Sequence, residues 1–392
     1  MRILSGIWMT KKINTETRTV QANHYCDPQT GSIVPAIYTS TTYARDKNYQ
    51  LISENYSYGR DENPSFAVPE RVLADLEGGE EALLFSSGMS AAIAVFQALE
   101  PGDHVVAPEI MYWGLREWLK EFSEKWGVAV TFYDVNEQNS LKNSIIKDET
   151  KLVWIETPCN PTWGVIDIEE AAEISHQNNA YLVVDSTVST PVITRPIDFG
   201  ADIVMHSATK YLNGHGDVVA GALVCHKKDA LWKKIHHNRT HGGAIPSPFD
   251  AWLLLRGMRT LFIRMEKINR SAMKIAKHFE NNDHISEVLY PGLTNHKGHK
   301  IAKKQMKTGF GGMLSLRIKG GEETALEIVK NCTVFMRATS LGGVESLIEH
   351  RYSIEGENSP IPRDLIRISV GIEYTEDLIN DLEKSIKKSI KS

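Results

Sequence analysis

The sequence has few cysteines, no long apolar run and no large excess of one charge. The 392 residues include four cysteines, which lie far apart and form no CxxC pair. This spacing argues against a disulfide framework or a metal site, and it favours reduced thiols in a cytoplasmic protein. No apolar run approaches the roughly 20 residues that a membrane-spanning helix needs. The net charge of −5 gives no reason to expect binding to nucleic acid or to an anionic membrane.

What remains is a globular chain with 42% hydrophobic and 24% charged residues, which is an ordinary balance. Its length predicts two or three domains. Residues 1–8 are too short for a secretory signal and lack a cleavage site, and Met9 is an alternative start. Residues 1–60 are rich in Thr, Tyr, Asn and Gln with little helical periodicity. This composition predicts an extended N-terminal arm that lies on another surface, such as that of a second subunit.

Residues 61–250 alternate between helical and strand patterns. Val68, Val72, Leu73 and Leu76 have helical spacing, and the glycines at 78–79 end that helix. Later strands are apolar on both faces and are separated by helices, which predicts a large domain with a mainly parallel sheet between helices. The predicted strands cover residues 82–85, 104–107, 128–133, 152–156, 181–185, 203–205 and 218–225.

The last third of the chain predicts a smaller C-terminal α/β domain over residues 251–392. Residues 249–281 form one long helical pattern without proline, which could bridge the two domains. Strands and helices follow in alternation. The strands are expected at residues 287–290, 313–318, 333–336 and 365–370.

Lys210 is the residue that most directly suggests a chemistry. It lies in Ser207-Ala208-Thr209-Lys210-Tyr211, after an apolar run and before a glycine-rich stretch, and Asp185 ends another apolar run upstream. A lysine on such a turn is a candidate for a Schiff base. Pyridoxal phosphate needs an amine for its aldehyde, an anion for its pyridine nitrogen and donors for its phosphate. The alternatives are local: Asp185 could cap the next segment, and the two hydroxyls could satisfy nearby backbone groups.

Three more segments lie at strand ends, where sheets of this kind bind ligands. Ser87-Gly88-Met89 joins a strand to a helix, so its backbone N–H groups form an anion site, although Ser87 could simply cap the helix. Asn160, between two prolines, could donate to a ring oxygen or shape the turn. Tyr112 could stack on a planar ring or belong to a core cluster with Trp113 and Trp118.

Taken together, the segments resemble the Cys/Met-metabolism (trans-sulfuration) branch of fold-type I pyridoxal-phosphate enzymes. This branch includes cystathionine gamma-synthase, the cystathionine beta- and gamma-lyases, methionine gamma-lyase and the homoserine-ester sulfhydrylases. The resemblance extends from about residue 17 to the final helix. The matching motifs are Tyr58-Gly59-Arg60, Asn63-Pro64-Ser65, Ser86-Ser87-Gly88-Met89, 156–162, Asp185-Ser186-Thr187, 207–217, 254–261, 340–347 and 367–373.

The resemblance implies a role for each candidate residue. Lys210 would hold the cofactor covalently and move protons, Tyr112 would stack on its ring and take part in catalysis, and Asp185 would pair with the pyridine nitrogen. Arg367 would bind the substrate carboxylate, with Asn160 and Ser340. The cofactor, and mainly its phosphate, would also be bound by Ser87, Gly88, Met89, Asn160, Ser207 and Thr209, and by Tyr58 and Arg60 across a subunit boundary. The expected assembly is a homotetramer built as a dimer of dimers.

Departures from the family pattern favour one subclass. Gly114 stands where methionine gamma-lyases carry cysteine, and Ser57 and Thr339 stand where gamma-acting members often carry glutamates. We therefore expect cleavage of cystathionine by beta-elimination to homocysteine, pyruvate and ammonia. Cystathionine gamma-synthase and gamma-lyase remain alternatives, as does a non-catalytic regulatory protein on the same fold. In the unusual stretch after residue 349, Arg351 and Glu357 are expected to form an ion pair at the rim of the site.

Overall fold

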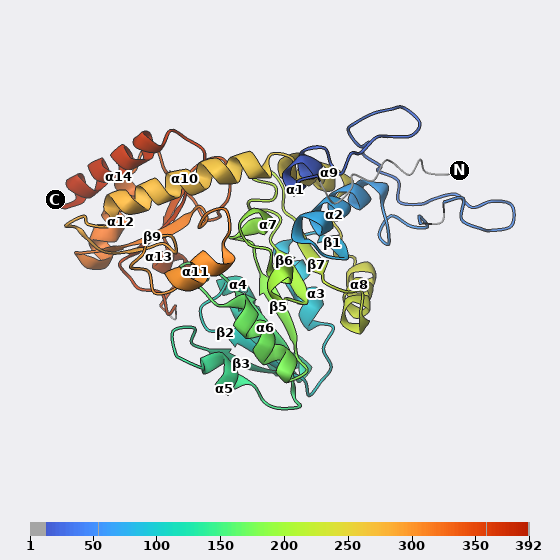
Figure 1. Ribbon diagram of the computed structural model, residues 1–392, viewed down its shortest axis with the longest axis horizontal. Coiled ribbons are helices and arrows are strands. Elements are labelled where there is room, and N and C mark those ends of the chain that lie inside the picture. The colour runs from blue at the N-terminus through green and yellow to red at the C-terminus, as the bar shows by residue number, and fades with distance from the viewer. Residues whose placement is uncertain (1–12, 54, 358, 391–392) are drawn as a thin grey trace. The chain divides into compact units, whose positions relative to one another are not determined.

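The computed structural model describes residues 13–53, 55–357 and 359–390 (Figure 1). The chain forms two compact units, and each unit combines two separate stretches of sequence. Unit 1 consists of Met1–Leu99 and Asp202–Phe262, and unit 2 consists of Glu100–Ala201 and Ile263–Ser392. Boundaries after residues 60 and 250 describe a different division and stay a prediction. The alternative start at Met9 lies outside the described residues.

Unit 1 contains three strands in the order β1-β7-β6, and β7 runs antiparallel to both neighbours. This is an exception to the mainly parallel arrangement expected for this part of the chain. The connection between β6 and β7 contains no helix, only the turns that carry Lys210. Strand β7 therefore returns antiparallel beside β6. The elements are α1 (Thr15–Val20), α2 (Pro64–Glu77), β1 (Glu81–Phe85), α3 (Gly88–Phe96), β6 (Ile203–His206), β7 (Gly221–Cys225), α8 (Ala230–Gly242) and α9 (Pro248–Met258).

Helix α2 confirms the helix expected before residues 78–79. Asn63 accepts a hydrogen bond from the Ser65 N–H at its start, and Pro64 occupies the first helical position. Gly78 ends the helix in the left-handed conformation at a φ of 74°, which glycine adopts without a steric penalty.

The long helix expected over residues 249–281 is wrong, because the chain breaks it in two. Helix α9 ends at Met258 and α10 (Leu261–Phe279) begins after Thr260. The Thr260 hydroxyl and N–H both donate to the carbonyl of Gly257, at 3.1 Å each. A threonine that bonds its own preceding turn in this way competes with the regular helical pattern.

Unit 2 contains the parallel strands, in the order β5-β4-β2-β3. Each adjacent pair is parallel, as expected for buried strands connected through helices. The elements of this part are β2 (His104–Pro108), α4 (Trp113–Trp126), β3 (Ala129–Tyr133), α5 (Ser140–Ser144), β4 (Thr150–Glu156), α6 (Ile168–Gln177), β5 (Tyr181–Asp185), α7 (Thr190–Ile193) and the 3-10 helix η1 (Pro196–Phe199).

A second sheet in unit 2 has the order β10-β11-β12-β9-β8 and is antiparallel except for the β10–β11 pair. Helices α10, α12 and α14 cover one of its faces (Figure 1). The other elements are β8 (Ile285–Leu289), α11 (His299–Gln305), β9 (Met313–Ile318), α12 (Gly321–Asn331), β10 (Met336–Arg337), β11 (Leu347–His350), α13 (Arg351–Glu355), β12 (Leu365–Ser369) and α14 (Thr375–Ile390).

Along the strands of this second sheet, side chains alternate between a face that packs on the hydrophobic core and a face that carries Arg367. Leu314, Leu316, Ile366 and Ile368 belong to the hydrophobic core shared with the three helices. Because side chains alternate along a strand, the residues between them point to the opposite face. Arg367 is one of these, which explains how a nearly inaccessible arginine avoids the apolar core.

The strand expected over residues 333–336 is mostly absent. Strand β10 contains only Met336 and Arg337. The N–H groups of Thr333, Val334 and Phe335 donate to the carboxylate of Asp381 on α14, and the Thr333 hydroxyl does so too. These bonds lower the pKa of Asp381, although burial acts in the opposite direction. The carboxylate thus replaces the neighbouring strand that these N–H groups would otherwise need.

The segment after α1 has the character expected of an arm. Between residues 25 and 62 the described residues form no helix and only isolated bridges, such as Thr42 with Tyr58. Ile33, Tyr49 and Ile52 are between 69% and 80% exposed. In this single chain the arm therefore leaves large apolar side chains in contact with solvent.

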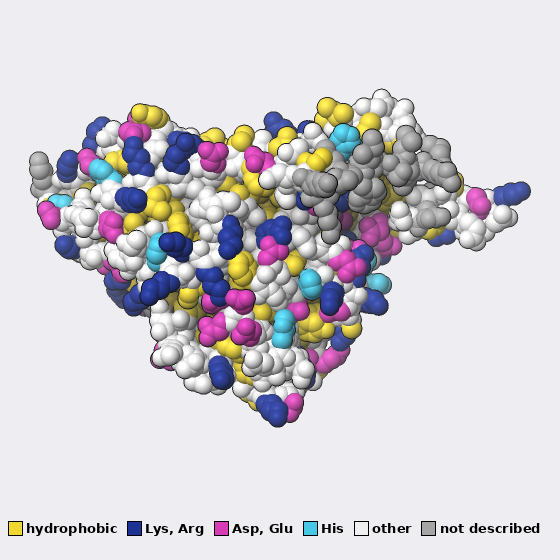
Figure 2. Space-filling model, viewed as in Figure 1, with side chains coloured by type: hydrophobic (Ala, Val, Ile, Leu, Met, Phe, Trp, Pro, Cys, Tyr) yellow, Lys and Arg dark blue, Asp and Glu magenta, His cyan; other side chains and the backbone are white. Residues whose placement is uncertain are grey.

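Charged side chains of both signs are interspersed over the face shown in Figure 2. None of the helices in the described ranges has the length and apolar character needed to cross a membrane.

Candidate functional residues in each unit

The candidate residues of unit 1 form the lysine turn, which we define as residues 207–210 together with 87–89. Lys210 follows β6 on a run of turns, where its N–H donates to the Ser207 carbonyl at 3.1 Å and its carbonyl accepts from Gly214 at 2.7 Å. Thr209 bonds the backbone of Ala220 through both its hydroxyl and its N–H. These bonds fix the backbone on both sides of the lysine.

Gly88 brings the start of α3 against this turn. A Cβ on Gly88 would lie 2.8 Å from both Cβ and Oγ of Ser207, and one on Gly221 would lie 2.0 Å from the Ser87 carbonyl oxygen. Only glycine permits such close approach of backbone segments. The predicted anion-binding residues Gly88, Met89 and Ser207 are therefore brought together, with the first N–H groups of a nine-residue helix beside them.

Ser87 has the local role that the sequence left open for it. Its hydroxyl accepts from the Ser90 N–H at 3.0 Å, and the Ser90 hydroxyl accepts from the Ser87 N–H at 2.9 Å. This is a reciprocal capping arrangement at the start of α3. A direct contact of Ser87 with a cofactor stays a prediction.

Tyr58 and Arg60 lie in the same unit as the lysine turn and contact each other. The Arg60 guanidinium lies 5.4 Å from the centre of the Tyr58 ring, and its Nε is 3.7 Å from Asp61. Both side chains are nearly half exposed. Within the described residues, neither forms a hydrogen bond or ion pair with Ser207 or Lys210.

Unit 2 has its own group of candidate residues, in which Glu156 contacts two of those predicted from the sequence. Its Oε2 accepts from the Tyr112 N–H at 2.6 Å and its Oε1 accepts from the Asn160 N–H at 2.9 Å. Burial, and then the charge of Asp185, raises the pKa of Glu156 to about 8. Asp185 is its register partner, because β4 and β5 pair these two residues at their carboxyl ends.

The alternatives for Tyr112 and Asp185 resolve differently. Tyr112 is 44% exposed, so it is not a member of the core. Asp185 is nearly buried, and its Oδ1 accepts from the Thr187 N–H at 3.0 Å, so it does cap the next segment. One carboxylate oxygen can do this while the other serves a ligand, and the cofactor role of Asp185 stays a prediction.

The arginine cluster, defined as Asn160, Glu349, Arg351 and Arg367, adds the predicted carboxylate-binding residues. Arg367 Nη1 donates to Asn160 Oδ1 at 3.3 Å, and Arg367 Nη2 donates to the Ser340 carbonyl at 2.7 Å. The structure thus brings together the three residues expected to bind a substrate carboxylate. Arg367 Nη2 also lies 2.7 Å from Glu349 Oε1.

The ion pair expected between Arg351 and Glu357 is wrong. Arg351 is buried and pairs with Glu349 at 3.0 Å and with Glu355 at 2.8 Å, whereas Glu357 is exposed. Arg351 begins α13, so Glu355 lies one helical turn further on and can reach back to it. The sequence reasoning missed Glu349 altogether. Its signal is the antiparallel register of β11 and β12, which places it opposite Arg367.

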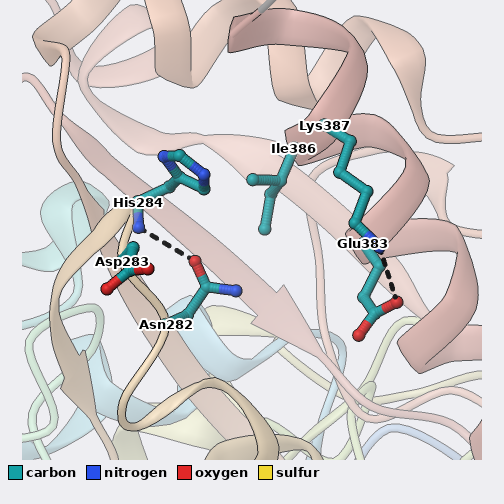
Figure 3. A pocket seen from close by; sticks show the side chains of 6 residues that line it. All are labelled: Asn282, Asp283, His284, Glu383, Ile386 and Lys387. Carbon is teal, nitrogen blue, oxygen red and sulfur yellow. Dashed lines mark hydrogen bonds and ion pairs between the residues drawn. The ribbon is translucent and has the colours of Figure 1, made fainter.

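A surface hollow elsewhere in unit 2 carries none of the predicted residues. It is lined by Asn282, Asp283 and His284 and by Glu383, Ile386 and Lys387 of α14 (Figure 3). Its polar groups bond one another: the His284 N–H donates to Asn282, and Lys387 donates to Glu383. No group of three or more His, Cys, Asp or Glu side chains in the described ranges could hold a metal ion.

The chain matches known proteins along nearly its whole length. The family model described as "Cys/Met metabolism PLP-dependent enzyme" matches residues 16–387. A cystathionine beta-lyase of Coxiella burnetii is 39% identical over 385 residues, covering 96% of this chain and 98% of the relative. A cystathionine gamma-synthase of Mycobacterium bovis is 40% identical over 376 residues, covering 94% of this chain and 96% of the relative.

The solved structures agree. A cystathionine gamma synthase from Xanthomonas oryzae pv. oryzae, in complex with aminoacrylate and cysteine, superposes with a TM-score of 0.92 at 36% identity, covering 97% of this chain and 99% of that chain. The expected fold class is therefore confirmed. Curated relatives at this level of identity carry beta-lyase, gamma-synthase and gamma-lyase names, so similarity alone does not select one activity.

Proposed function

Because the chain belongs to the Cys/Met metabolism PLP-dependent enzyme family, we propose that it is a carbon–sulfur lyase that cleaves cystathionine by beta-elimination. One water is consumed, and the products are homocysteine, pyruvate and ammonia, the last two from hydrolysis of the three-carbon fragment that the elimination leaves. The observation that supports a small amino-acid substrate is the arginine cluster, where Arg367 donates a hydrogen bond to Asn160 and both side chains are buried. The preference for beta over gamma chemistry rests on Ser57 and Thr339, which offer no carboxylate to a distal ammonium group.

The residues present fit pyridoxal phosphate. Gly88 lets the start of α3 lie against Ser207, so the first N–H groups of this helix and the Ser207 hydroxyl come together in unit 1 as an anion-binding set. Gly88, Met89, Ser207 and Thr209 would hold the phosphate, together with Tyr58 of the partner subunit and Arg60 of the partner subunit. Lys210 would be the covalent attachment point, Asp185 the partner of the pyridine nitrogen and Tyr112 the stacking ring. When bound, the cofactor supplies an electron sink for negative charge at the substrate Cα.

The chain's own residues then bind the substrate and move its protons. Arg367 would bind the substrate carboxylate through its planar guanidinium, and Asn160 keeps that guanidinium oriented. The Lys210 amine would take the proton from Cα, which allows the bond between Cβ and sulfur to break with its electron pair on sulfur. The released thiolate takes up a proton and leaves as homocysteine.

The runner-up activities are those of a cystathionine gamma-synthase and a cystathionine gamma-lyase, whose names other relatives carry. Both need a second proton removed at Cβ before a group leaves from the γ-carbon. A regulatory protein without catalysis is a weaker alternative, because it has no need for Lys210, Asp185 and Arg367 together.

Product analysis separates these functions. The purified holoenzyme is incubated with cystathionine, and separately with O-succinylhomoserine plus cysteine. Pyruvate from the first incubation supports beta-elimination, whereas 2-oxobutyrate indicates gamma-cleavage. Net cystathionine formation in the second incubation would overturn the lyase assignment. The absence of bound cofactor and of any turnover would favour the regulatory alternative.

We also propose a homotetramer, built as a dimer of dimers, and a cytoplasmic location. The exposed apolar residues of the arm, such as Ile33 and Ile52, support a second copy as the covering surface. Light scattering on the purified protein tests the proposed assembly. A monomeric mass would contradict the homotetramer and also the roles of Tyr58 and Arg60 across subunits.

A further inference from the structure

Two buried arginines share a single carboxylate oxygen in the arginine cluster. Glu349 Oε1 lies 2.7 Å from Arg367 Nη2 and 3.0 Å from Arg351 Nη1. The three side chains are between 3% and 6% exposed. Ion pairs this deeply buried respond strongly to the loss of one partner, because the remaining charge loses its compensation.

The backbone dictates this arrangement. Glu349 on β11 is the antiparallel register partner of Arg367 on β12, so their side chains leave the sheet on the same face. Arg351 follows two residues after Glu349, where α13 begins, and Glu355 pairs with it from the next turn. Arg351 therefore forms ion pairs with both Glu349 and Glu355, whereas Arg367 forms one with Glu349.

The distribution of contacts on Glu349 is uneven. Its Oε1 serves both guanidinium groups, whereas its buried Oε2 has no hydrogen-bond partner among the described residues. A carboxylate facing a guanidinium tends to use both oxygens in a bidentate pair. Because Oε2 is unpartnered, Glu349 and Arg367 do not form a bidentate pair here, and the shared Oε1 also contacts Arg351.

Arg351 is also close to the rest of the unit 2 site. Burial and the charge of Asp185 raise the pKa of Glu156, and the charge of Arg351 acts on the same carboxyl in the opposite direction. Arg351 therefore does not belong to a remote rim, and a change at this residue can reach the groups that bind the substrate.

We propose that Arg351 is a positioning residue for substrate binding: it shares the Oε1 atom of Glu349 with Arg367 and so keeps Glu349 from forming a bidentate pair with Arg367 that a substrate carboxylate could not displace. Without Arg351, Glu349 turns both oxygens to Arg367 and neutralises it. The inference rests on the proposed role of Arg367 as the carboxylate-binding residue. It does not depend on whether the reaction is beta-elimination or gamma-replacement.

Calorimetric titration of the holoenzyme with L-alanine tests the inference, because this probe has the α-amino carboxylate and no sulfur leaving group. The first variant combines Arg351→Met with Glu355→Gln, which removes one positive and one negative charge together. It should bind L-alanine about tenfold more weakly than wild type. Adding Glu349→Gln removes the competing carboxylate and should restore binding to within about threefold of wild type.

This recovery distinguishes positioning from a merely structural role, because a third substitution in a damaged site would not restore affinity. Equal affinity of wild type and the double variant, or no recovery in the triple variant, would overturn the inference. If the double variant does not fold, Arg351→Lys replaces it. Lysine cannot bridge Glu349 and Glu355 with a planar fork, so binding should weaken, and unchanged binding would contradict the proposal.

The matched control is Arg363→Met, which removes an arginine that is 63% exposed and pairs with Glu322 at the surface. It should leave L-alanine binding unchanged. Failure of wild type to bind L-alanine at all would remove the role of Arg367 and the inference with it. Binding of L-alanine without turnover of cystathionine would instead contradict the proposed reaction and leave the inference standing.

Discussion

The lysine turn and the arginine cluster consist of different kinds of chemical groups. Around Lys210 the structure uses close backbone approach, hydroxyls and helix N–H groups, with Gly88 packed against Ser207 and Gly221 against Ser87. Around Arg367 it uses buried charged side chains that bond one another. The lysine turn should therefore be sensitive to added volume, and the arginine cluster to altered charge.

The largest effect should follow from removing the one side chain of the lysine turn that carries the chemistry. Lys210→Ala should lower kcat by about 10²–10⁴-fold, the range that proton transfer by a positioned side chain contributes. The fold should survive, because the backbone bonds of Lys210 to Ser207 and Gly214 do not involve its side chain. Steady-state pyruvate formation and circular dichroism measure the two outcomes.

Lys228→Ala is the matched control, because Lys228 is a half-exposed lysine of unit 1 that pairs with Glu81 at the surface. It should leave kcat unchanged. Turnover in Lys210→Ala within a factor of a few of wild type would show that another group moves the proton.

In the arginine cluster, Arg367→Lys keeps the charge and removes the fork. Arg367 contacts Asn160, Ser340 and Glu349 at once, and a single ammonium group cannot reproduce that geometry. KM should rise by about 100-fold with a smaller change in kcat. Arg317→Lys, which affects a partly exposed arginine of β9 paired with Asp364, should change neither constant. A loss confined to kcat would contradict substrate binding as the role of Arg367.

Added volume is the corresponding test of the lysine turn. Gly88→Ala places a Cβ 2.8 Å from Ser207, so one of the two segments must move. Overpacking of this kind should cost about 1–3 kcal/mol of unfolding free energy and weaken cofactor retention. Thermal unfolding and dialysis against cofactor-free buffer measure these effects. Gly242→Ala at the end of α8 meets nothing within 4 Å and should retain both properties, whereas equal behaviour of the two variants would exclude a tight contact at Gly88.

The same contrast explains what the sequence alone could predict. Ser207, Lys210 and Gly88 could be identified from short motifs that follow predicted strands, because in such turns the neighbouring residues largely determine the local geometry. Glu349 gives no such signal, because its partnership with Arg367 depends on how two strands align. The partner of Arg351 is likewise not readable from the sequence. The start of α13 determines that its side chain reaches Glu349 and Glu355 and not the predicted Glu357. The helix break before Leu261, where the Thr260 N–H and hydroxyl both bond the Gly257 carbonyl, likewise leaves no mark on the apolar periodicity of residues 249–281.

The smallest effect on activity should come from Glu156, which differs from Glu349 because no guanidinium among the described residues forms a hydrogen bond or ion pair with it. Burial, followed by the charge of Asp185, raises the pKa of Glu156 to about 8. Between the ordinary value of 4.5 and about 8, the native state therefore holds a proton that the unfolded chain has lost. Stability must fall as the pH rises through this window, by at most about 1.4 kcal/mol per pH unit from this group.

Glu156→Gln removes this titration while keeping the shape of the protonated acid. Gln has one acceptor oxygen for the N–H groups of Tyr112 and Asn160, so the variant should lose stability at low pH. Relative to wild type, it should recover as the pH rises from 6 towards 8. Glu70, whose pKa burial raises to about 7, titrates in both proteins and cancels in the difference. The exposed Glu121→Gln should run parallel to wild type at every pH, and a parallel curve for Glu156→Gln would mean that this carboxyl is already ionised in the native state.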